Sequence, residues 1–226
     1  MKLSFDWRFL AFLNYRLEGG AFDRYLPEGL EVDDDGRGPL FSFVASVVHK
    51  TQRWGIHFSK KPFVQFHGQC YVRNRHRRGV LWLDLGARPK IWKFFNQRTF
   101  GARWKQLETR QSIEFNPGEQ GASAKVAYSG ENDQGKVSLK METGGPIYSM
   151  DLEPVEAFIW EREFFFTPHR KEPLHLERPL WFCWQALNAQ LTFDGDPFMG
   201  SELSRWTKAE PESAFLVKGS SVLLHD

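Results

Sequence analysis

The stretch from residue 63 to residue 87 constrains the fold more than any other part of the chain, because it reads as two strands joined by a basic turn. In the first strand, every second side chain falls on a face that is largely polar: Phe63, Gln65, His67, Gln69 and Tyr71. The opposite face, formed by residues 64, 66, 68, 70 and 72, is mostly apolar. Period-two alternation is typical of a strand whose faces meet different surroundings. The row Gln65–His67–Gln69 therefore either faces water or lines a cavity, and alternation leaves both open.

Turn signals divide the rest of the chain into many short segments that are typical of strands. Predicted strands cover residues 10–17, 40–49, 80–85, 111–115, 122–128, 136–142, 161–167, 174–177, 181–191 and 213–224, the last as a strand pair or an edge strand. Helices are predicted within residues 88–107, beginning near Pro89 with Gly101 ending the first helix, and briefly at 22–26, and residues 154–160 are predicted to be a short helix or a turn. The acidic loop 32–38 is predicted to be a solvated hairpin tip. This pattern favours a single domain over residues 1–226 with a mainly β (α+β) fold, an antiparallel sheet closing toward a barrel.

Aromatic residues make up 15% of the chain, with 21 Phe and 9 Trp. So many aromatic side chains exceed the needs of one compact core, and some are expected to line a groove or pocket, as they do in many ligand sites. Aromatic cross-strand pairs within a sheet are the alternative. The formal net charge of +2 is far below the basic excess of typical nucleic-acid-binding domains, so no nucleic-acid partner is expected.

Motifs for cofactors and metals do not stand out in the sequence. Cys70 and Cys183 form no CxxC pair, so neither a zinc site nor a disulfide framework is predicted. No P-loop, HExxH, GxSxG or dinucleotide-binding pattern is present, and no cofactor is predicted. Asp6 and Arg8 interrupt the apolar amino terminus, and no run approaches the ~18 apolar residues of a membrane span. We expect a soluble cytoplasmic protein with no membrane partner, either monomeric or homo-oligomeric.

Several spaced motifs together resemble a known family. They are FLNYRL with RYLPEGLEVD near the start, FxxFxxxxYV followed by RGVLWLDLGA, then EREFFF, and lastly ERPLW. Their order and spacing over residues 8–195 resemble the uncharacterised, YqjF-like bacterial proteins, a domain of unknown function within the acetoacetate-decarboxylase-like fold. The resemblance implies a closed, cone-like antiparallel β-barrel with a few short helices and an interior cavity.

The resemblance also implies what this chain lacks. Acetoacetate decarboxylase forms an imine through a desolvated lysine beside a second lysine, which keeps the nucleophilic amine neutral. Where that pair is expected, this chain has Trp104 followed by Lys105, so that only one lysine remains. The dipeptide Lys60–Lys61 lies in a loop and is interpreted as solvated surface. Relatives carry acidic, Asn and Arg side chains on the strand that matches Gln65–Gln69, so the resemblance implies a more neutral pocket here, without the arginine that commonly clamps a carboxylate.

Four further features are candidates for a site. His67 could act as an acid, base or hydrogen-bonding group, with a structural role as the alternative. Asp84 is placed by simple alternation on the face of Val80 and Trp82, where a buried carboxylate needs a partner. Trp181 is expected at the cavity wall or in plain core. The basic turn Arg73–Arg78 could bind phosphate, or it could simply discourage edge-to-edge pairing of sheets.

Three functional hypotheses follow from these residues. The leading one is a protein that binds a small, mostly apolar molecule in a barrel cavity through Gln65, His67, Gln69, Tyr71, Asp84 and Trp181, without Schiff-base chemistry. The second is a decarboxylase-like lyase that acts on a small keto acid through Lys105. The third is nucleic-acid binding through Arg73–Arg78, which requires an affinity that falls steeply with salt.

Overall fold

The structure of this chain is a computed structural model. It describes residues 2–53, 56–57, 61–90, 93, 96, 99–116, 123–144, 146–151, 153–179, 182–198 and 201–226. The side chains of Arg53, Ile56, His57 and residues 182–190 lie outside this description.

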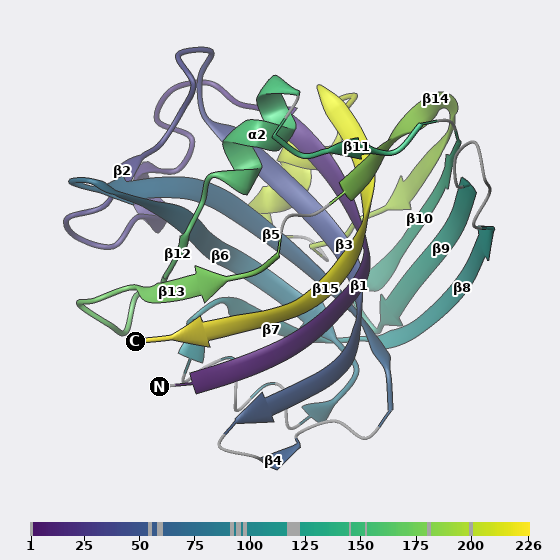
Figure 1. Cartoon of the computed structure of the whole chain (residues 1–226), viewed down its shortest axis with the longest axis horizontal. Helices are drawn as coiled ribbons and strands as arrows, with labels where there is room; N and C mark the ends of the chain where they lie inside the picture. The colour runs from purple at the N-terminus through teal and green to yellow at the C-terminus, as the bar shows by residue number, and fades with distance from the viewer. Residues whose placement is uncertain are drawn as a thin grey trace.

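A closed ring of seven strands forms the centre of the described structure (Figure 1). In order around the ring these are β1 (Lys2–Arg16), β3 (Leu40–Arg53), β5 (Phe63–Asn74), β6 (Arg77–Ala87), β12 (Phe164–Phe166), β13 (Leu174–Glu177) and β15 (Ser213–His225). Pairing of β15 with β1 closes the ring, from Lys2 opposite His225 to Asn14 opposite Ser213. The predicted barrel is confirmed, and most neighbouring strands are antiparallel as expected. The exceptions lie along β6, which pairs in parallel with β12 at its start and with β7 (Arg103–Gln106) at its end.

A second set of strands branches from the ring through β14 (Phe182–Gly195), which pairs with both β15 and β10 (Gly135–Thr143). The sheet continues through β9 (Ser123–Asn132) to β8 (Glu108–Asn116), the meander that the sequence predicts. Figure 1 shows this meander as a separate layer at the right of the ring. Short strands β2 (Glu31–Val32), β4 (Ile56–His57) and β11 (Tyr148–Ser149) pair with β5, β3 and β14.

Helical segments are few in the described part of the chain. The predicted helix at 154–160 is confirmed as α2 (Pro154–Trp160), which starts with proline at its first turn. Short 3-10 helices occupy Asp23–Tyr25, within the predicted helix 22–26, and Glu202–Thr207. Residues 90, 93, 96 and 99 are helical, but 103–106 form β7, so the helix predicted for 88–107 ends earlier. Gly101 has a φ of 70°, a left-handed conformation that favours glycine after a helix.

Two other expectations about strands were wrong in detail. The segment 213–224 is neither a hairpin nor an edge strand, since the single strand β15 is covered by β1 on one side and by β13 and β14 on the other. The first strand begins at Lys2, not at residue 10, because Phe9 takes a φ of 48° and forms a bulge that lets one long strand turn with the barrel.

Both faces of the barrel wall are buried, which decides how the polar row of β5 can be satisfied. The inner face contributes one apolar cluster that includes Trp7, Val44, Trp82 and Phe215. Outer-face residues such as Phe43 and Phe66 form a second cluster with the meander, which contributes Tyr128. Three residues of α2 join the inner cluster, Val155, Phe158 and Ile159, so the helix covers one end of the barrel (Figure 1).

Candidate functional site

The polar row of β5 faces the inside of the barrel. Gln65, His67 and Gln69 are 0%, 5% and 6% exposed, so water does not cover this face. Their strand neighbours Phe63 and Tyr71 belong to the inner apolar cluster, whereas Cys70 belongs to the outer one. Of the two readings that alternation left open, the structure supports the interior one.

A directed chain of hydrogen bonds satisfies most of this row. Gln65 Nε2 lies 3.2 Å from His67 Nδ1, and His67 Nε2 lies 3.3 Å from Gln69 Oε1. Gln69 Nε2 donates to the Tyr71 hydroxyl at 3.0 Å, and Tyr71 lies 2.6 Å from Ser42 Oγ. From there Ser42 donates to Asn14 Oδ1 at 2.5 Å, and Asn14 donates to Ser213 Oγ at 2.9 Å. The chain thus links β5, β3, β1 and β15 across the barrel interior.

His67 is a neutral imidazole with one defined tautomer. Burial lowers the pKa of His67 from 6.5 to about 3, while its hydrogen bond to Gln69 acts in the opposite direction. Because the Gln65 amide is a donor, Nδ1 must accept, and the Nε2–H then donates to Gln69 Oε1. The same oxygen accepts the indole N–H of Trp82 at 3.3 Å. His67 is therefore held as a hydrogen-bonding group, and a buried imidazole with this pKa is a poor general base at neutral pH.

A cavity of about 50 Å³ lies against this row. Its polar lining comes from His67, Gln69 and Arg178. The rest of the wall is apolar and is formed by Trp7, Leu10, Phe12, Val80, Trp82, Met150, Ile159, Phe165 and Leu176. Ordinary ligand pockets have volumes of roughly 300–1,000 Å³, whereas one water needs about 10–15 Å³, so this space fits a group of only a few heavy atoms. The Trp82 ring lies 4.5 Å from that of His67 and forms part of an aromatic wall.

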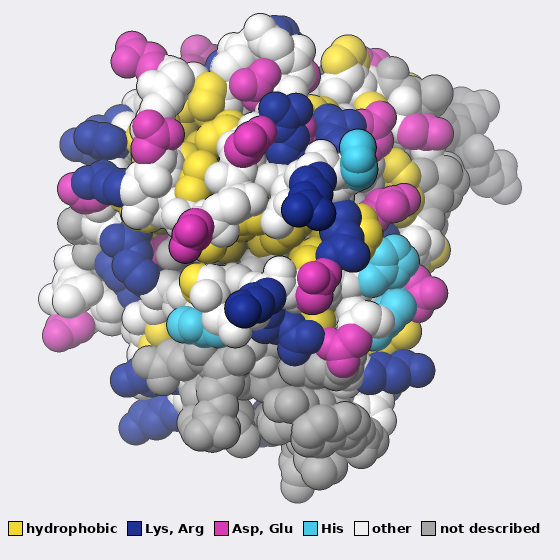
Figure 2. Space-filling view, turned by 90° about the vertical axis from the view of Figure 1, so that its left-hand side faces the viewer, with side chains coloured by type: hydrophobic (Ala, Val, Ile, Leu, Met, Phe, Trp, Pro, Cys, Tyr) yellow, Lys and Arg dark blue, Asp and Glu magenta, His cyan; other side chains and the backbone are white. Residues whose placement is uncertain are grey.

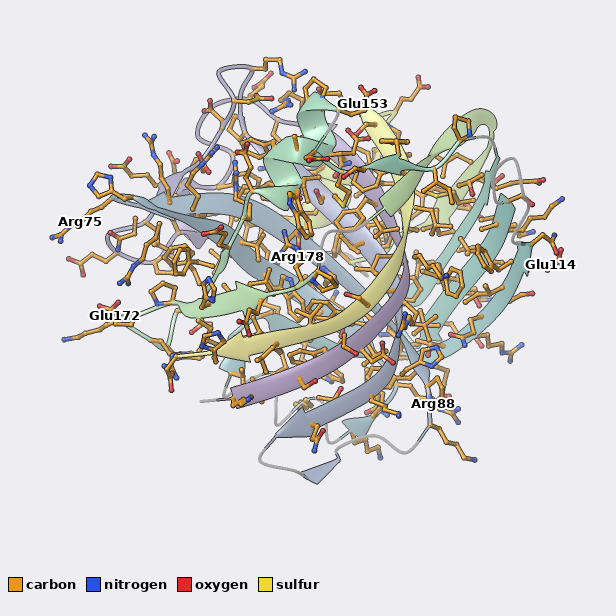
Figure 3. The ribbon with its side chains drawn as sticks, viewed as in Figure 1. Arg75, Arg88, Glu114, Glu153, Glu172 and Arg178 are labelled. Atoms are coloured by element: carbon orange, nitrogen blue, oxygen red, sulfur yellow. The ribbon has the colours of Figure 1, made fainter. Side chains whose placement is uncertain are left out.

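Arg178 is the cation of this cavity, and residue-by-residue sequence reasoning missed it. It lies in the segment between β13 and β14, near the middle of Figure 3, while Arg75 and Glu172 lie at the periphery of that view. Its guanidinium donates to the carbonyl oxygens of Trp160 at 2.6 Å and Arg162 at 3.2 Å, and stacks over the Trp160 ring at 4.4 Å. Burial lowers the pKa of Arg178 to about 10, so it is charged at neutral pH. The ERPLW motif contains it, but only as a mark of resemblance.

Asp84 lies on the other side of the wall from the one that simple alternation predicts. The register of β6 against β5 shifts at Leu83, so Trp82 is opposite Gln69 while Asp84 is opposite Gly68, on the outer face. Asp84 is 2% exposed, and Arg103 lies 3.6 Å from its Oδ2. Burial raises the pKa of Asp84 to about 7, against the lowering effect of nearby Arg103 and Lys105. It therefore does not line the inner cavity.

A family model described as an uncharacterized conserved protein, DUF2071, matches residues 4–220. The chain belongs to the DUF2071 family. Among curated proteins, none matches it. The narrower YqjF-like name stays a prediction, whereas the wider expectation of an uncharacterised family is confirmed.

Solved structures similar to this DUF2071 chain share its fold at low identity. The enduracididine biosynthesis enzyme MppR, with HEPES bound, has a TM-score of 0.64 and 15% identity, over 100% of this chain and 86% of the other. An acetoacetate decarboxylase-like enzyme from Sphingomonas wittichii RW1 has a TM-score of 0.61 and 11% identity, over 99% and 89%. Acetoacetate decarboxylase from Legionella pneumophila has a TM-score of 0.59 and 12% identity, over 100% and 85%. The acetoacetate-decarboxylase-like fold is thereby shown.

Strand β7 shows how the DUF2071 chain uses the two positions at which the lysine pair is expected. Trp104 packs against the inner cluster, so the inward position is aromatic. Lys105 is opposite Gly86, whose missing side chain leaves room for Leu107 of the outer cluster, and its ammonium donates to the carbonyl oxygen of Phe198. Burial lowers the pKa of Lys105, and Asp84 and Asp196 act in the opposite direction. No lysine is buried among the described residues, and Lys105 does not line the inner cavity.

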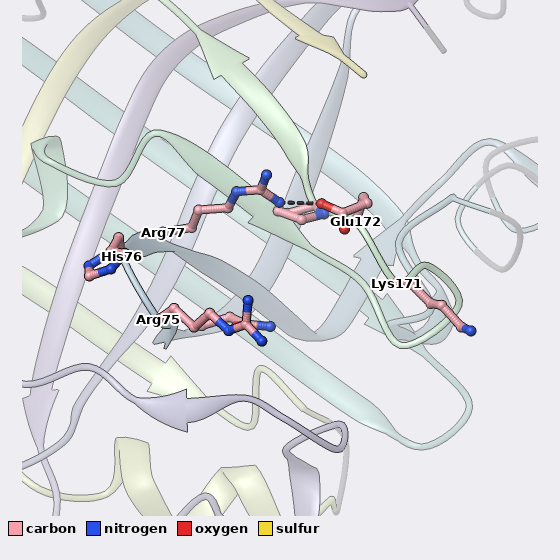
Figure 4. A pocket seen from close by; sticks show the side chains of 7 residues that line it. Arg75, His76, Arg77, Lys171 and Glu172 are labelled. Atoms are coloured by element: carbon pink, nitrogen blue, oxygen red, sulfur yellow. Dashed lines mark hydrogen bonds and ion pairs between the residues drawn. The ribbon is translucent and has the colours of Figure 1, made fainter.

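The basic turn between β5 and β6 is largely neutralised by carboxylates. Arg73 lies 3.2 Å from Glu31, Arg77 pairs with Glu172, and Arg78 lies 2.8 Å from both Asp33 and Glu161. Figure 4 shows the Arg77–Glu172 pair beside an open hollow of about 370 Å³. Ion pairs of this kind reduce the charge available to a phosphate backbone, so they do not favour the nucleic-acid hypothesis.

The acidic loop contains a buried charge that the sequence analysis placed in solvent. Asp33 is 3% exposed, and its Oδ2 lies 2.9 Å from Arg162 as well as 2.8 Å from Arg78. Arg162 is fully buried and its guanidinium lies 3.7 Å above the Phe158 ring. The prediction of a solvated tip is therefore wrong for Asp33, because a buried arginine requires a carboxylate partner.

The remaining expectations concern Trp181, the pair Lys60–Lys61, metal sites and membrane spans. Trp181 and Lys60 lie outside the described residues, and Lys61 is exposed. Within the described ranges, no group of three or more His, Cys, Asp or Glu is arranged to hold a metal ion. None of the helices in those ranges is long and apolar enough to cross a membrane.

Proposed function

We propose that this protein binds a small, mostly apolar molecule inside its barrel, without imine chemistry. The observation that carries the proposal is the cavity beside His67 and Gln69, whose wall combines nine apolar side chains with three polar ones. Sites for small molecules commonly have this composition, in which a few polar groups orient a ligand that apolar contacts hold.

The row on β5 supports binding because its hydrogen bonds fix its groups in advance. The His67 tautomer and the Gln69 amide are both set by their partners, so these groups lose little conformational freedom when a ligand arrives. Gln65 supports the row from behind, because its amide bonds to His67 while Gln65 itself does not line the cavity.

The tryptophan at position 104 supports the second half of the proposal. Imine catalysis needs a desolvated lysine that faces the substrate. The side chain that faces inward on β7 is Trp104, and Lys105 contacts the Phe198 carbonyl on the other side. The comparisons with enzymes of this fold, all at 15% identity or less, carry the fold and not the reaction.

Native mass spectrometry tests this function most directly. Gently purified protein is expected to show an extra mass that disappears on denaturation, and the same spectrum reports the oligomeric state. The variant Val80→Phe adds bulk to the cavity wall and is expected to abolish the extra mass. Val32→Phe adds the same bulk on β2, away from the cavity, and is the matched control. Retention of an extra mass by Val80→Phe at wild-type occupancy would place the ligand elsewhere and contradict the proposal.

A further inference from the structure

A second, larger hollow adjoins the inner cavity at one end of the barrel. It has a volume of about 630 Å³ and lies between α2, β13 and the start of β6. Leu176 and Arg178 line both this outer hollow and the inner cavity. These two side chains therefore form a shared wall between the two spaces.

Charge in the outer hollow is arranged by depth. Its carboxylates, from Glu161, Glu163 and Glu177, belong to exposed residues, whereas Arg162 is fully buried and Arg178 is half-buried. Figure 2 shows one face of the molecule, on which basic and acidic side chains are mixed and hydrophobic side chains are visible between them. Water screens the exposed carboxylates, and the charge of Arg162 is balanced by the buried Asp33, so the positive potential at the floor of the hollow comes mainly from Arg178.

Arg178 is held in position before any ligand binds. Its guanidinium bonds to the carbonyl oxygens of residues at the end of α2, and the Trp160 ring supports its flat face. On the adjacent strand, the backbone N–H of Leu176 bonds to the Glu163 carbonyl at 2.7 Å, which fixes β13 against the segment that leads into β12. Glu163 also stabilises the charge of Arg178. A guanidinium held in this way presents a fixed positive charge to an anionic oxygen.

We propose that the ligand carries one anionic oxygen group, which binds at Arg178 on the floor of the outer hollow, and a short apolar end, which enters the inner cavity past Leu176. This inference rests on the proposed function and adds the class of ligand and its direction of entry. The volumes agree with it: about 50 Å³ accepts only a short apolar end, and about 630 Å³ accommodates the head group. Carboxylates, sulfonates and phosphate monoesters share the required chemistry.

A matched pair of probes tests the head group. Hexanoate and 1-hexanol have equal carbon chains, so a difference in their affinity for the protein reports the anionic group alone. Titration calorimetry is expected to show tighter binding of hexanoate, by roughly 10- to 100-fold, which is the usual range for a charge-assisted hydrogen bond. Arg178→Met should remove this preference while 1-hexanol still binds. Arg77→Met removes an arginine that lines neither space and is expected to keep it.

Further variants keep the test decisive. Arg178→Lys keeps the positive charge but loses the planar guanidinium group, so it should still prefer hexanoate to 1-hexanol, with lower affinity. This variant keeps the test informative if Arg178→Met folds poorly. Leu176→Trp adds bulk at the proposed point of entry and is expected to weaken the binding of both probes. Equal affinity of the two probes for the wild type, or an unchanged preference in Arg178→Met, would overturn the inference while the proposed function stands. Failure of both probes, together with a native mass equal to the denatured mass, would remove both.

Discussion

The two faces of strand β5 are equally buried but are stabilised in different ways. On the outer face, Val64, Phe66 and Val72 pack against other apolar side chains of the outer cluster. On the inner face, Gln65, His67 and Gln69 are satisfied mainly by one another and by side chains of adjacent strands. Alternation of polar and apolar residues therefore does not require water on either side of a strand. A polar face can be as dry as an apolar one where its groups form a hydrogen-bonded chain.

The largest expected effect comes from the outer face. Phe66→Ala removes a side chain that is 1% exposed and stacks at 6.0 Å on Phe43, leaving a cavity between the barrel wall and the meander. The free energy of unfolding should fall by about 3–5 kcal/mol, as measured by chemical denaturation. A loss below about 1 kcal/mol would show that the outer face collapses around the gap and is less tightly packed than the structure indicates.

A smaller loss is expected on the inner face, and it should depend on position in the hydrogen-bonded chain. Gln69→Leu leaves His67, Trp82 and Tyr71 each without the partner that Gln69 supplies, at about 2–3 kcal/mol in total. Gln65→Leu is the matched control because it removes only one hydrogen bond, to His67, and should cost about 1 kcal/mol. Equal losses for the two variants would argue against a chain in which Gln69 is the central member.

The two faces should also respond oppositely to pH. The pKa of His67 is about 3 in the folded protein and 6.5 when exposed, so the unfolded chain binds its proton first and stability falls as pH drops from 6.5 towards 3. The pKa of Asp84, on the outer face, is about 7 instead of 3.8, so stability falls as pH rises from about 4 to 7. Each group changes the free energy of unfolding by at most ~1.4 kcal/mol per pH unit.

Single variants separate these two opposing effects of pH on the free energy of unfolding. In His67→Gln, the loss of stability on acidification should become weaker, whereas in Asp84→Asn the loss on raising the pH towards 7 should become weaker. Denaturation midpoints between pH 4 and pH 7 measure both. If both variants change the pH dependence of the unfolding free energy in the same direction, one of the two groups does not have the protonation state that its burial predicts.

The smallest expected effect is in a labelling experiment, which tests whether Lys105 forms an imine with a keto acid. Treatment with a β-keto acid and borohydride should leave Lys105 unlabelled, because this lysine lies on the outer side of the wall with its ammonium bonded to a carbonyl oxygen. Peptide mass spectrometry measures the outcome. A reduced adduct on Lys105 would show that substrate reaches the outer side, and it would revive the lyase hypothesis.

Strand positions were well predicted from the sequence, while the faces of some residues were not. The hairpin 63–87 was found from alternation and a turn, and the structure has strands Phe63–Asn74 and Arg77–Ala87 there. Asp84 was assigned to the wrong face because one extra residue at Leu83 reverses the alternation, and a bulge has no distinct signature in an apolar run.

The residues that line the inner cavity were only partly predictable from the sequence. His67 and Gln69 could be named because they share a strand, whereas Arg178 reaches the cavity from a segment more than a hundred residues later. Its only sequence signal was a place in the ERPLW motif. Asp33 was misjudged for the same reason, since its burial depends on Arg78 and on Arg162, which is contributed by a distant part of the chain.

Closure of the barrel has a consequence for biosynthesis. Strand β1 pairs along almost its whole length with β15, from Lys2 opposite His225 onward, and the two ends of the chain lie together in Figure 1. During translation, β1 and β3 emerge long before their closing partner, so the growing chain carries an unpaired strand edge until residues 213–225 are made. Open edges recruit other chains, and pairing over so long a sequence separation is slow. Yield in the cell should therefore depend on chaperones that shield this edge as much as on the stability of the finished barrel.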